Sequence, residues 1–303
     1  MSRMTSFFVL QPIVFASLAM AGPYDSYLTT GVAPTSITAW ANAVDDYSPT
    51  AEVVEFDMFG GGPHNVPANG LGPADGVTVS LGDLDTAAIN SGTAPGSITV
   101  HFQETLLDGP GADFAVFENA GAFFNSHDVN FIFAELAFVE VSSNGLDYAR
   151  FPAISLNIDE DTNTPDPNHD QLHAPYGRAF TGVNTTNIKN LTGVHPVLIG
   201  TPFDLNELSN DPLVTQGTVD LMGIRHIRFI DIPGDGSFTD SLGNPIFDAW
   251  KSEESGGFDL DAVGAINIVP EPTALFLSIA ALWMFQIVES ARNARIRSRT
   301  IHS

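Results

Sequence analysis

The chain of 303 residues contains no cysteine and few basic residues. Without cysteine there are no disulfides, so cohesion must come from buried apolar side chains and from any bound ion. The 11 Lys and Arg stand against 36 Asp and Glu, which gives a formal net charge of −25. We therefore expect no nucleic-acid partner, because that binding depends on clustered basic residues that neutralise phosphates.

Long uninterrupted helices are also not expected, since 27 Gly and 20 Pro punctuate the chain. Apolar residues make up 44% of the sequence and include 22 Phe, enough for a sizeable core. Disordered chains have low hydrophobicity, so this composition indicates a folded protein. The length allows one large β domain or two small ones.

Residues 1–21 have the pattern of a secretory signal peptide. Arg3 is the positive start, residues 7–18 are the apolar stretch, and Ala19-Met20-Ala21 is the small-x-small cleavage pattern. We expect cleavage before Gly22 and export of the body. An ordinary buried N-terminal helix is the alternative interpretation.

An almost uninterrupted apolar run, residues 273–288, lies near the other end of the chain. Sixteen residues rise about 24 Å as a helix, short of the roughly 30 Å hydrocarbon core, so we expect a marginal transmembrane helix. Basic residues at both ends of the chain favour cytoplasmic termini, with the body on the far side of the inner membrane. A permanent single-span anchor is consistent with the same pattern.

Residues 269–303 resemble the PEP-CTERM sorting signal, in which a Pro-Glu-Pro stretch, a short apolar helix and an arginine-rich tail follow one another. The residues that carry the resemblance are Pro270, Glu271, Pro272, Arg292 and Arg295. The resemblance implies that an exosortase-type membrane protease recognises the tail and cleaves it near Pro-Glu-Pro, with transient anchoring in the inner membrane. The basic tail is longer than is usual in the family. The same tail is sometimes called an ice-binding protein C-terminal domain, a label that says nothing about the body.

The body, residues 22–268, keeps six basic residues against 34 acidic ones, a net charge near −28. Self-repulsion on this scale destabilises a compact state unless cations neutralise part of it. A ligand that binds only the folded state stabilises it. We therefore expect bound divalent metal, with Ca²⁺ as the candidate ion.

Seven segments of the body alternate between apolar and polar residues and are separated by turn-forming residues. They cover residues 77–81, 96–102, 113–118, 136–142, 148–156, 224–232 and 258–268. Parallel strands would need crossover helices, so we predict an all-β fold, an antiparallel β-sandwich of jelly-roll rather than immunoglobulin type. Residues 35–44 and 84–90 are candidates for helical turns, and residues 159–186 read as an acidic, Pro-rich insertion loop.

Asp259 and Asp261 belong to the last predicted strand, where alternation places both carboxylates on one face. On a partly buried face Ca²⁺, which takes about six to eight oxygen ligands, would remove their repulsion. On a solvated face no ion is needed. We expect Glu118 and Asp113, at the two ends of another strand, as their cross-sheet partners.

The segment 231–248 gathers oxygen-bearing residues in a Gly-containing turn, with Asp231, Asp235 and Asp240 as candidate calcium ligands. It lacks the alternating Asp and the terminal Glu of an EF-hand loop. An ordinary Asp/Gly turn is the competing interpretation.

Catalytic motifs are absent from the sequence, with no Gly-x-Ser-x-Gly elbow, P-loop or dinucleotide-binding turn. His169 and His173 have the helical spacing of zinc ligands, but neighbouring prolines indicate a solvated loop. The candidate platforms for sugar stacking are Trp40, Trp250 and Tyr176, with burial in the core as the alternative.

The body also resembles a domain that recurs among PEP-CTERM surface proteins, through residues 111–119, 135–143, 200–205 and 256–264. The resemblance implies a surface location and a β-rich fold without a catalytic mechanism. We expect a non-enzymatic exported cell-surface or matrix protein that shares Ca²⁺ with acidic exopolysaccharide. One alternative is a secreted polysaccharide-active enzyme with a carboxylate pair in a deep cleft; another is an adhesion module with an exposed apolar patch for a protein partner.

Overall fold

The computed structural model describes residues 22–25, 27–50, 63–122, 131–157, 182–252 and 256–269. These residues are predominantly β, and every strand pairing among them is antiparallel, which confirms the all-β class. The predicted signal peptide, the sorting motif and the apolar run 273–288 lie outside the described residues. Within the described part of the chain, no helix has the length and apolar character needed to cross a membrane.

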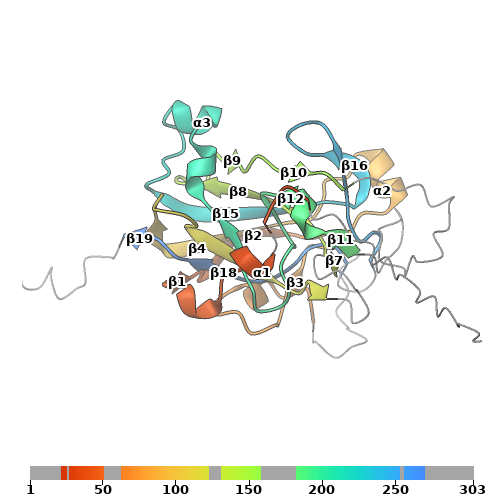
Figure 1. Cartoon of the computed structure of the whole chain (residues 1–303), viewed down its shortest axis with the longest axis horizontal. Coiled ribbons are helices and arrows are strands. Elements are labelled where there is room, and N and C mark those ends of the chain that lie inside the picture. Colours follow the sequence, from red (N-terminus) through yellow and green to blue (C-terminus); the bar gives the residue numbers. More distant parts are fainter. Residues whose placement is uncertain are drawn as a thin grey trace, which may run out of the picture.

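Two sheets hold most of the strands (Figure 1). The smaller consists of β1 (Ala39–Trp40), β18 (Asp259–Ala265), β5 (Phe114–Glu118) and β14 (Thr201–Phe203), with β3 (Val79–Ser80) also paired to β18. The larger consists of β13 (Leu191–Thr192), β8 (Ala137–Ser142), β15 (Ile224–Asp231), β4 (Ser97–Leu106) and β19 (Ile268–Val269), with β2 (Ala43–Ser48) paired to β4 and β9 (Ala149–Arg150) paired to β8.

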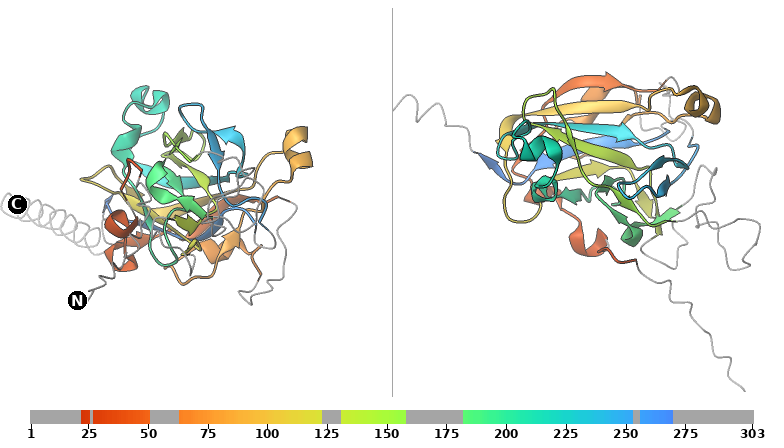
Figure 2. Two further views of the ribbon diagram at one scale, coloured as in Figure 1. Left: turned by 45° about the vertical axis from the view of Figure 1, so that its right-hand side comes forward. Right: turned by 90° about the horizontal axis from the view of Figure 1, so that it is seen from above.

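Smaller elements surround these sheets, and Figure 2 shows the short helices at the edges of the molecule. The minor sheets are β11 (Gly182–Asn184) with β7 (Phe131–Phe133) and β6 (Gly121–Ala122), β10 (Ile154–Ser155) with β12 (Ile188–Lys189), and β16 (Asp235–Thr239) with β17 (Pro245–Phe247). The α-helices are α1 (Tyr27–Thr30), α2 (Thr86–Ser91) and α3 (Pro212–Thr215). The 3-10 helices are η1 (Pro34–Ser36), η2 (Pro67–Gly70), η3 (Thr185–Asn187) and η4 (Leu205–Leu208).

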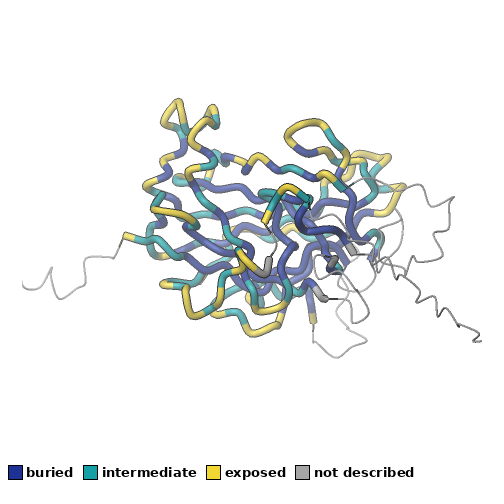
Figure 3. Tube along the Cα trace, viewed as in Figure 1, coloured by how far each residue is buried: buried dark blue, intermediate teal, exposed yellow. Residues whose placement is uncertain are grey.

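The main core takes residues from strands of both large sheets. Along β15, buried and partly exposed residues alternate from residue 226 to residue 231, as expected for a strand with one face on a core. Phe203 packs against Phe114 and Phe151 with ring centroids 5.1 and 5.0 Å apart. Figure 3 shows that buried residues follow the strands and exposed residues the connections.

Each of the seven predicted strand segments contains at least one strand, and the segment 148–156 contains two short ones, β9 and β10. The helical turn predicted at 84–90 is confirmed by α2, which Asp85 caps by accepting a hydrogen bond from the Ala88 N–H. The expectation for 35–44 is largely wrong. Only η1 is helical there, because β1 and β2 pair with strands far away in the sequence, β18 and β4.

The predicted insertion loop 159–186 is described only at its end. There β11 and the start of η3 replace the expected irregular chain, because β11 pairs with β7. Residues 158–181 lie outside the described residues.

Candidate metal centre

Asp and Glu side chains are rarely buried completely unless they are paired, yet several Asp and Glu residues of this chain are buried. Many of them gather where β15 and β5 end and β18 begins. We call this group the buried carboxylate cluster, and none of its members is more than 4% exposed: Asp83, Glu118, Glu135, Asp231, Asp248 and Asp259.

Strand pairing explains half of this gathering. Because β18 runs antiparallel to β5, its first residue, Asp259, lies beside Glu118, the last residue of β5. Asp231 is the last residue of β15, and its Oδ1 accepts a hydrogen bond of 2.8 Å from the Phe258 N–H. This bond ties the end of one large sheet to the beginning of β18 in the other. In Figure 1, α2, which follows Asp83, and β16, which follows Asp231, lie on the same side of the molecule.

The other three carboxylates come from connections between strands. The Leu136 N–H donates to Asp248 Oδ2 at 2.7 Å, and the Ser252 N–H donates to Asp83 Oδ2 at 3.3 Å. The Ser252 hydroxyl donates in turn to Glu135 Oε1. Ser252 therefore links two of the buried carboxylates through its backbone and its side chain.

Burial and neighbouring negative charges raise the pKa values of five carboxylates of the cluster. Burial is the larger cause for Asp83, with the charge of Asp231 next; burial likewise raises the pKa of Asp231, to which Asp259 adds. The pKa values of Glu135, Glu118 and Asp248 also lie well above their ordinary values, again chiefly because of burial. Each of these five carboxylates therefore binds a proton more readily than in water, or calls for a cation.

Lys251 carries a positive charge near the cluster and lowers the pKa of Asp83. Its effect there is smaller than those of burial, of Asp231 and of the backbone N–H donors. One lysine does not balance six carboxylates.

Several side-chain oxygens of this region are buried and have no hydrogen-bond partner within the described chain. They are Asp83 Oδ1, Glu118 Oε1, Asp231 Oδ2, Asp248 Oδ1 and the Oδ1 of the adjacent Asn119. Asn119 Nδ2 donates to Asp259 Oδ2 at 2.6 Å, so the amide belongs to the same region. A buried polar atom without a partner costs about 1–3 kcal/mol, and more when it is charged. A cation bound to these oxygens would remove that cost.

Two glycines let the backbone approach the carboxylates closely. Gly257 has φ +70°, and a Cβ there would lie 2.7 Å from both Asp231 Oδ1 and the Gly82 carbonyl oxygen. A Cβ at Gly234 would overlap Asp248 Oδ1. Glycine at these positions leaves room for the two carboxylates, and at Gly257 also for the Gly82 carbonyl oxygen.

This donor set consists of oxygens, which suits a hard cation such as Ca²⁺. No three carboxylates of the cluster bring ligand atoms within 4.8 Å of one another, since the described triads that do so lie elsewhere. An ion in the cluster would therefore lie between pairs of carboxylates. Ca²⁺ also takes neutral oxygens as ligands, and the region offers Asn119 Oδ1 beside Asp259 and the Gly82 carbonyl near Asp231.

Of the predicted pair on the last strand, Asp259 joins the cluster and Asp261 has a separate role. The register of β18 against β5 shifts between Leu260 and Ala262, so a bulge at Asp261 interrupts the expected alternation. Both oxygens of Asp261 accept backbone hydrogen bonds of 3.1 Å, from the N–H groups of Asp75 and Gly76. Its charge still raises the pKa of Glu118, which places it beside the cluster.

The structure does not bring Asp113 to the cluster. Asp113 precedes β5 and Glu118 ends it, so the strand separates them by about 17 Å at about 3.4 Å per residue. Asp113 Oδ1 accepts from Gly109 N and Asn267 Nδ2, and Oδ2 accepts from Leu205 N. Asp113 thus connects three segments of the chain, and it also offers a ligand atom within 4.8 Å of those of Asp108 and Asp204, a separate group that could hold a metal ion.

Asp235 and Asp240 fit the competing interpretation of Asp/Gly turns. Asp235 Oδ1 accepts a hydrogen bond of 2.9 Å from the Ser237 N–H. The carboxylate of Asp240 accepts N–H hydrogen bonds from Ser155 and, within its own turn, from Leu242 and Asn244. Burial raises the pKa of Asp240, but these bonds outweigh burial and hold the pKa below its ordinary value.

Sequence reasoning missed Asp83 and Glu135 and included Asp248 only as the end of the segment 231–248, although a signal was present. Each acid interrupts a short stretch of apolar or glycine residues, as in Gly82-Asp83-Leu84, Ala134-Glu135-Leu136 and Phe247-Asp248-Ala249. An acid inside such a stretch is buried together with its apolar neighbours, and a buried charge needs a hydrogen-bond partner, a cation or a metal ion.

The aromatic candidates for sugar stacking are held within the protein where they are described. Trp40 packs on Phe117 with ring centroids 5.4 Å apart, and Trp250 Nε1 donates to the Leu84 carbonyl at 2.9 Å. Both tryptophans are partly buried. Tyr176 and the pair His169 and His173 lie outside the described residues.

Compared with protein-family models and with curated proteins, the chain matches neither a family nor a relative.

Proposed function

We propose that this protein is an exported, non-enzymatic cell-surface or matrix protein whose fold is stabilised by Ca²⁺ in the buried carboxylate cluster. The observation that carries the calcium part is the set of buried carboxylate oxygens, on Asp83, Asp231 and Asp248 among others, with no hydrogen-bond partner in the described chain. A cation with about six to eight oxygen ligands accounts for them.

The proposed fold is an antiparallel sandwich of jelly-roll type. It is supported by the main core, to which strands of both large sheets contribute, and by the hydrogen bond between Asp231 at the end of β15 and Phe258 before β18. An ion at this junction would hold the two sheets together where they meet.

The partner we propose is acidic exopolysaccharide, bridged to the acidic surface of the protein by shared Ca²⁺. The body has a net charge near −28, so binding to a polyanion needs an intervening cation. Export rests on the signal-peptide pattern of residues 1–21. Sorting rests on the resemblance of residues 269–303 to PEP-CTERM tails, and with it an exosortase-type protease as a partner.

A polysaccharide-active enzyme would also use carboxylates with raised pKa values, as a general acid must hold its proton. The cluster has such carboxylates, but none is more than 4% exposed. A glycan cannot reach them in the folded protein. This inaccessibility favours a structural role for the cluster over catalysis.

Thermal melting of the purified protein in Ca²⁺ and in chelator tests the calcium part. We expect a higher midpoint in Ca²⁺, since an ion at about 100 times its Kd adds about 2.7 kcal/mol to the folded state. Mg²⁺ is the control, because it demands tighter octahedral geometry and is expected to stabilise less. Identical midpoints in Ca²⁺ and chelator would remove calcium from the proposal.

Intact-mass measurement of the protein from the cell envelope and the medium tests the sorting part independently of calcium. We expect a chain that starts at Gly22 and ends near Pro-Glu-Pro. A full-length chain to Ser303 in the membrane would contradict processing, and a full-length chain in the cytosol would contradict export.

A further inference from the structure

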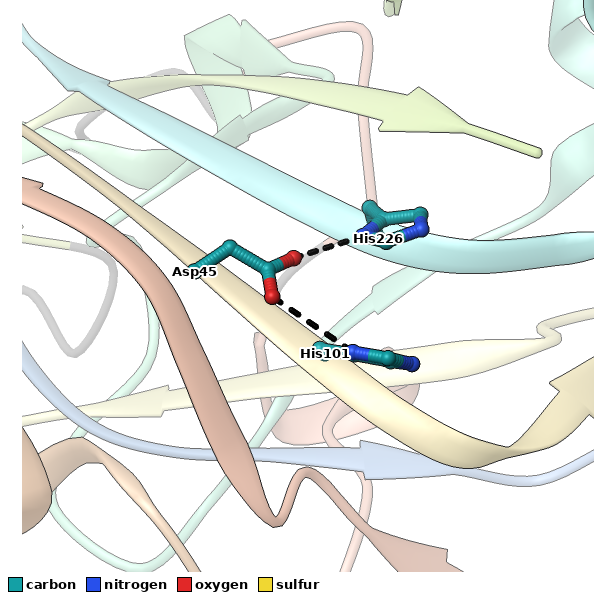
Figure 4. Close-up of side chains that lie close together, drawn as sticks. All are labelled: Asp45, His101 and His226. Carbon is teal, nitrogen blue, oxygen red and sulfur yellow. Dashed lines mark hydrogen bonds and ion pairs between the residues drawn. The ribbon is translucent and has the colours of Figure 1, made fainter. Parts of the chain in front are cut away.

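A second group of metal-ligand side chains lies on the larger sheet, away from the buried carboxylate cluster. Asp45 on β2, His101 on β4 and His226 on β15 come from three adjacent strands and converge (Figure 4). His226 and Asp231, both on β15, are five residues apart, about 17 Å at about 3.4 Å per residue. Asp231 is buried, whereas His226 belongs to the partly exposed face of the strand.

The register of the strands assembles this group. His101 and His226 are direct cross-strand partners, and Ala43 of β2 stands opposite His101 on its other side. The register of β2 against β4 shifts between Val44 and Asp46, so Asp45 is the extra residue of a bulge. A bulge re-aims a side chain, and here it turns the Asp45 carboxylate toward the two histidines.

A second register shift, on β15 between Ile224 and His226, adjoins the histidine pair. Gly145, in the turn after β8, has φ +73°, and a Cβ there would stand 3.2 Å from His226 Cε1. The backbone of this turn therefore lies against the His226 ring and limits its rotation. Two bulges and a close turn at one place on a regular sheet fix the positions of these side chains, as bulges do next to active sites.

The ligand atoms face one another. Asp45 Oδ2 lies 2.6 Å from His226 Nδ1, and Asp45 Oδ1 lies 3.4 Å from His101 Nδ1. The two imidazole rings are 4.7 Å apart between centroids, with 34° between their planes. One carboxylate oxygen and the two nitrogens all lie within 4.8 Å of one another.

We propose that Asp45, His101 and His226 form a site for a divalent transition-metal ion of the Zn²⁺ type. Two imidazole nitrogens and one carboxylate oxygen suit zinc, whereas the all-oxygen cluster suits calcium. With three protein ligands, the fourth position of a tetrahedral ion faces solvent and takes water or a donor from a bound molecule.

The distances agree with this assignment after a small adjustment. Ligands at about 2.0–2.1 Å from a tetrahedral ion stand about 3.3 Å apart, close to the separation of Asp45 and His101. The shorter contact with His226 is a hydrogen bond in the ion-free protein, and an ion would replace its proton. The Asp45 side chain is 35% exposed, so it has room to withdraw by the required fraction of an ångström.

Titration calorimetry with Zn²⁺, at neutral pH and with Ca²⁺ already saturating, tests the proposal on the full chain. The variants are Asp45→Asn and His226→Ala, and the matched control is Asp46→Asn, which changes the exposed acid next to Asp45 on the same strand. We expect one equivalent of Zn²⁺ in the wild type and in the control. In the two site variants we expect binding weakened by more than about tenfold, since even residues that only support metal ligands are worth about 10–100-fold.

A measurement on the wild type keeps the test independent of variant folding. Zn²⁺ should shift the imidazole NMR signals of His101 and His226 and leave those of His64 and His195 in place. Co²⁺ in the same site should give the d–d absorption of a tetrahedral nitrogen–oxygen site. Absence of Zn²⁺ binding, unchanged signals of His101 and His226, or full binding by folded Asp45→Asn would each overturn the proposal. Because Ca²⁺ is saturating throughout, these outcomes do not depend on the buried carboxylate cluster.

Discussion

Glu140 and Asp231 are buried carboxylates on neighbouring strands of one sheet, but their surroundings differ in charge. Arg228 of β15 and Arg150 of β9 stand opposite Glu140 on either side in the strand register. Their Nε atoms donate to the two Glu140 oxygens at 2.6 and 2.7 Å. Asp231 has the Phe258 N–H on one oxygen, no hydrogen-bond partner on the other within the described chain, and like-charged neighbours.

The comparison shows how a protein with few cations divides its buried negative charge. The body has six basic residues, and two of them complete Glu140. At the end of β15, Lys251 acts on Asp83, one of the six carboxylates of the cluster. A buried ion pair is complete by itself, whereas the cluster takes up protons or a metal ion according to conditions.

The largest expected effect that separates the two regions is the pH dependence of the metal-free protein. Burial, with neighbouring carboxylates, raises the pKa of Asp231 to about 7 and that of Asp83 to about 8. The unfolded values are near 3.9, so the folded state binds more protons between there and pH 7 to 8. The stability from these protons is full below about pH 4, falls as pH rises, and is lost once pH has passed through 7 to 8. A single proton gives a loss of roughly 4 kcal/mol between about pH 5 and 8.

Denaturant unfolding in chelator across this pH range measures the loss. With saturating Ca²⁺ the curve should be nearly flat, because the ion replaces the protons. Parallel pH profiles with and without Ca²⁺ would show that the cluster carries no metal-linked charge.

The next largest effect is expected at Glu140, whose charge is paired by Arg228 and Arg150. Arg228→Met leaves Glu140 buried with one of its two cations and should cost about 2 kcal/mol, less than breaking a fully buried pair, because the Arg228 side chain is 34% exposed. The loss should be the same in Ca²⁺ and in chelator, because Glu140 is not part of the cluster. Chemical denaturation under both conditions measures it.

Arg225→Met is the control for this change, since Arg225 lies on the same strand and donates to Thr105 Oγ1. Its cost should stay below about 1 kcal/mol, as is usual for a partly exposed site. If Arg228→Met were harmless, the pairing of Glu140 would not matter for stability, and the contrast with Asp231 would fail.

The smallest effect, and the sharpest in sign, is expected from Asp83→Asn. In chelator above pH 8, where Asp83 is ionised, the variant should be about 1 kcal/mol more stable than the wild type, because an amide removes repulsion from Asp231. In Ca²⁺ it should be less stable than the wild type, because it lacks a charged ligand. Asp85→Asn, two residues away, is the matched control, because Asn caps a helix as well as Asp does.

Melting curves of both variants in the two conditions decide the matter. The Asp85→Asn variant should follow the wild type in each. A loss of stability by Asp83→Asn in chelator as well as in Ca²⁺ would mean that Asp83 serves the fold through its hydrogen bond from Ser252 alone.

Alternation in the sequence was sufficient to predict the long strands. β15 alternates between buried and partly exposed residues from 226 to 231 and β4 does so over part of its length, whereas all six residues of β8 are buried and were indicated by their apolar side chains. The edge strand β2 was missed because Asp45 and Asp46 interrupt the alternation in its middle. Only its pairing with β4 shows that it is a strand. The Asp45 group was missed with it.

The metal candidates were predicted in part for a similar reason. Glu118, Asp231 and Asp259 end or begin strands, so a sequence pattern points to them. Asp113 and Asp240 have the same composition around them, but backbone N–H groups satisfy their oxygens. Which acid receives such donors depends on segments remote in the chain.

The order of residues by itself determined that this protein is all-β, acidic and without disulfides, and it marked the two terminal segments as transport signals to be tested. The tertiary structure alone decided which carboxylates have oxygens without a hydrogen-bond partner in the described chain, which pair with arginines, and which lie beside histidines on one face of a sheet. The physical reason is that alternation and composition act locally. The burial of a charge and the register at a bulge depend on contacts between strands that the chain brings together only when it folds.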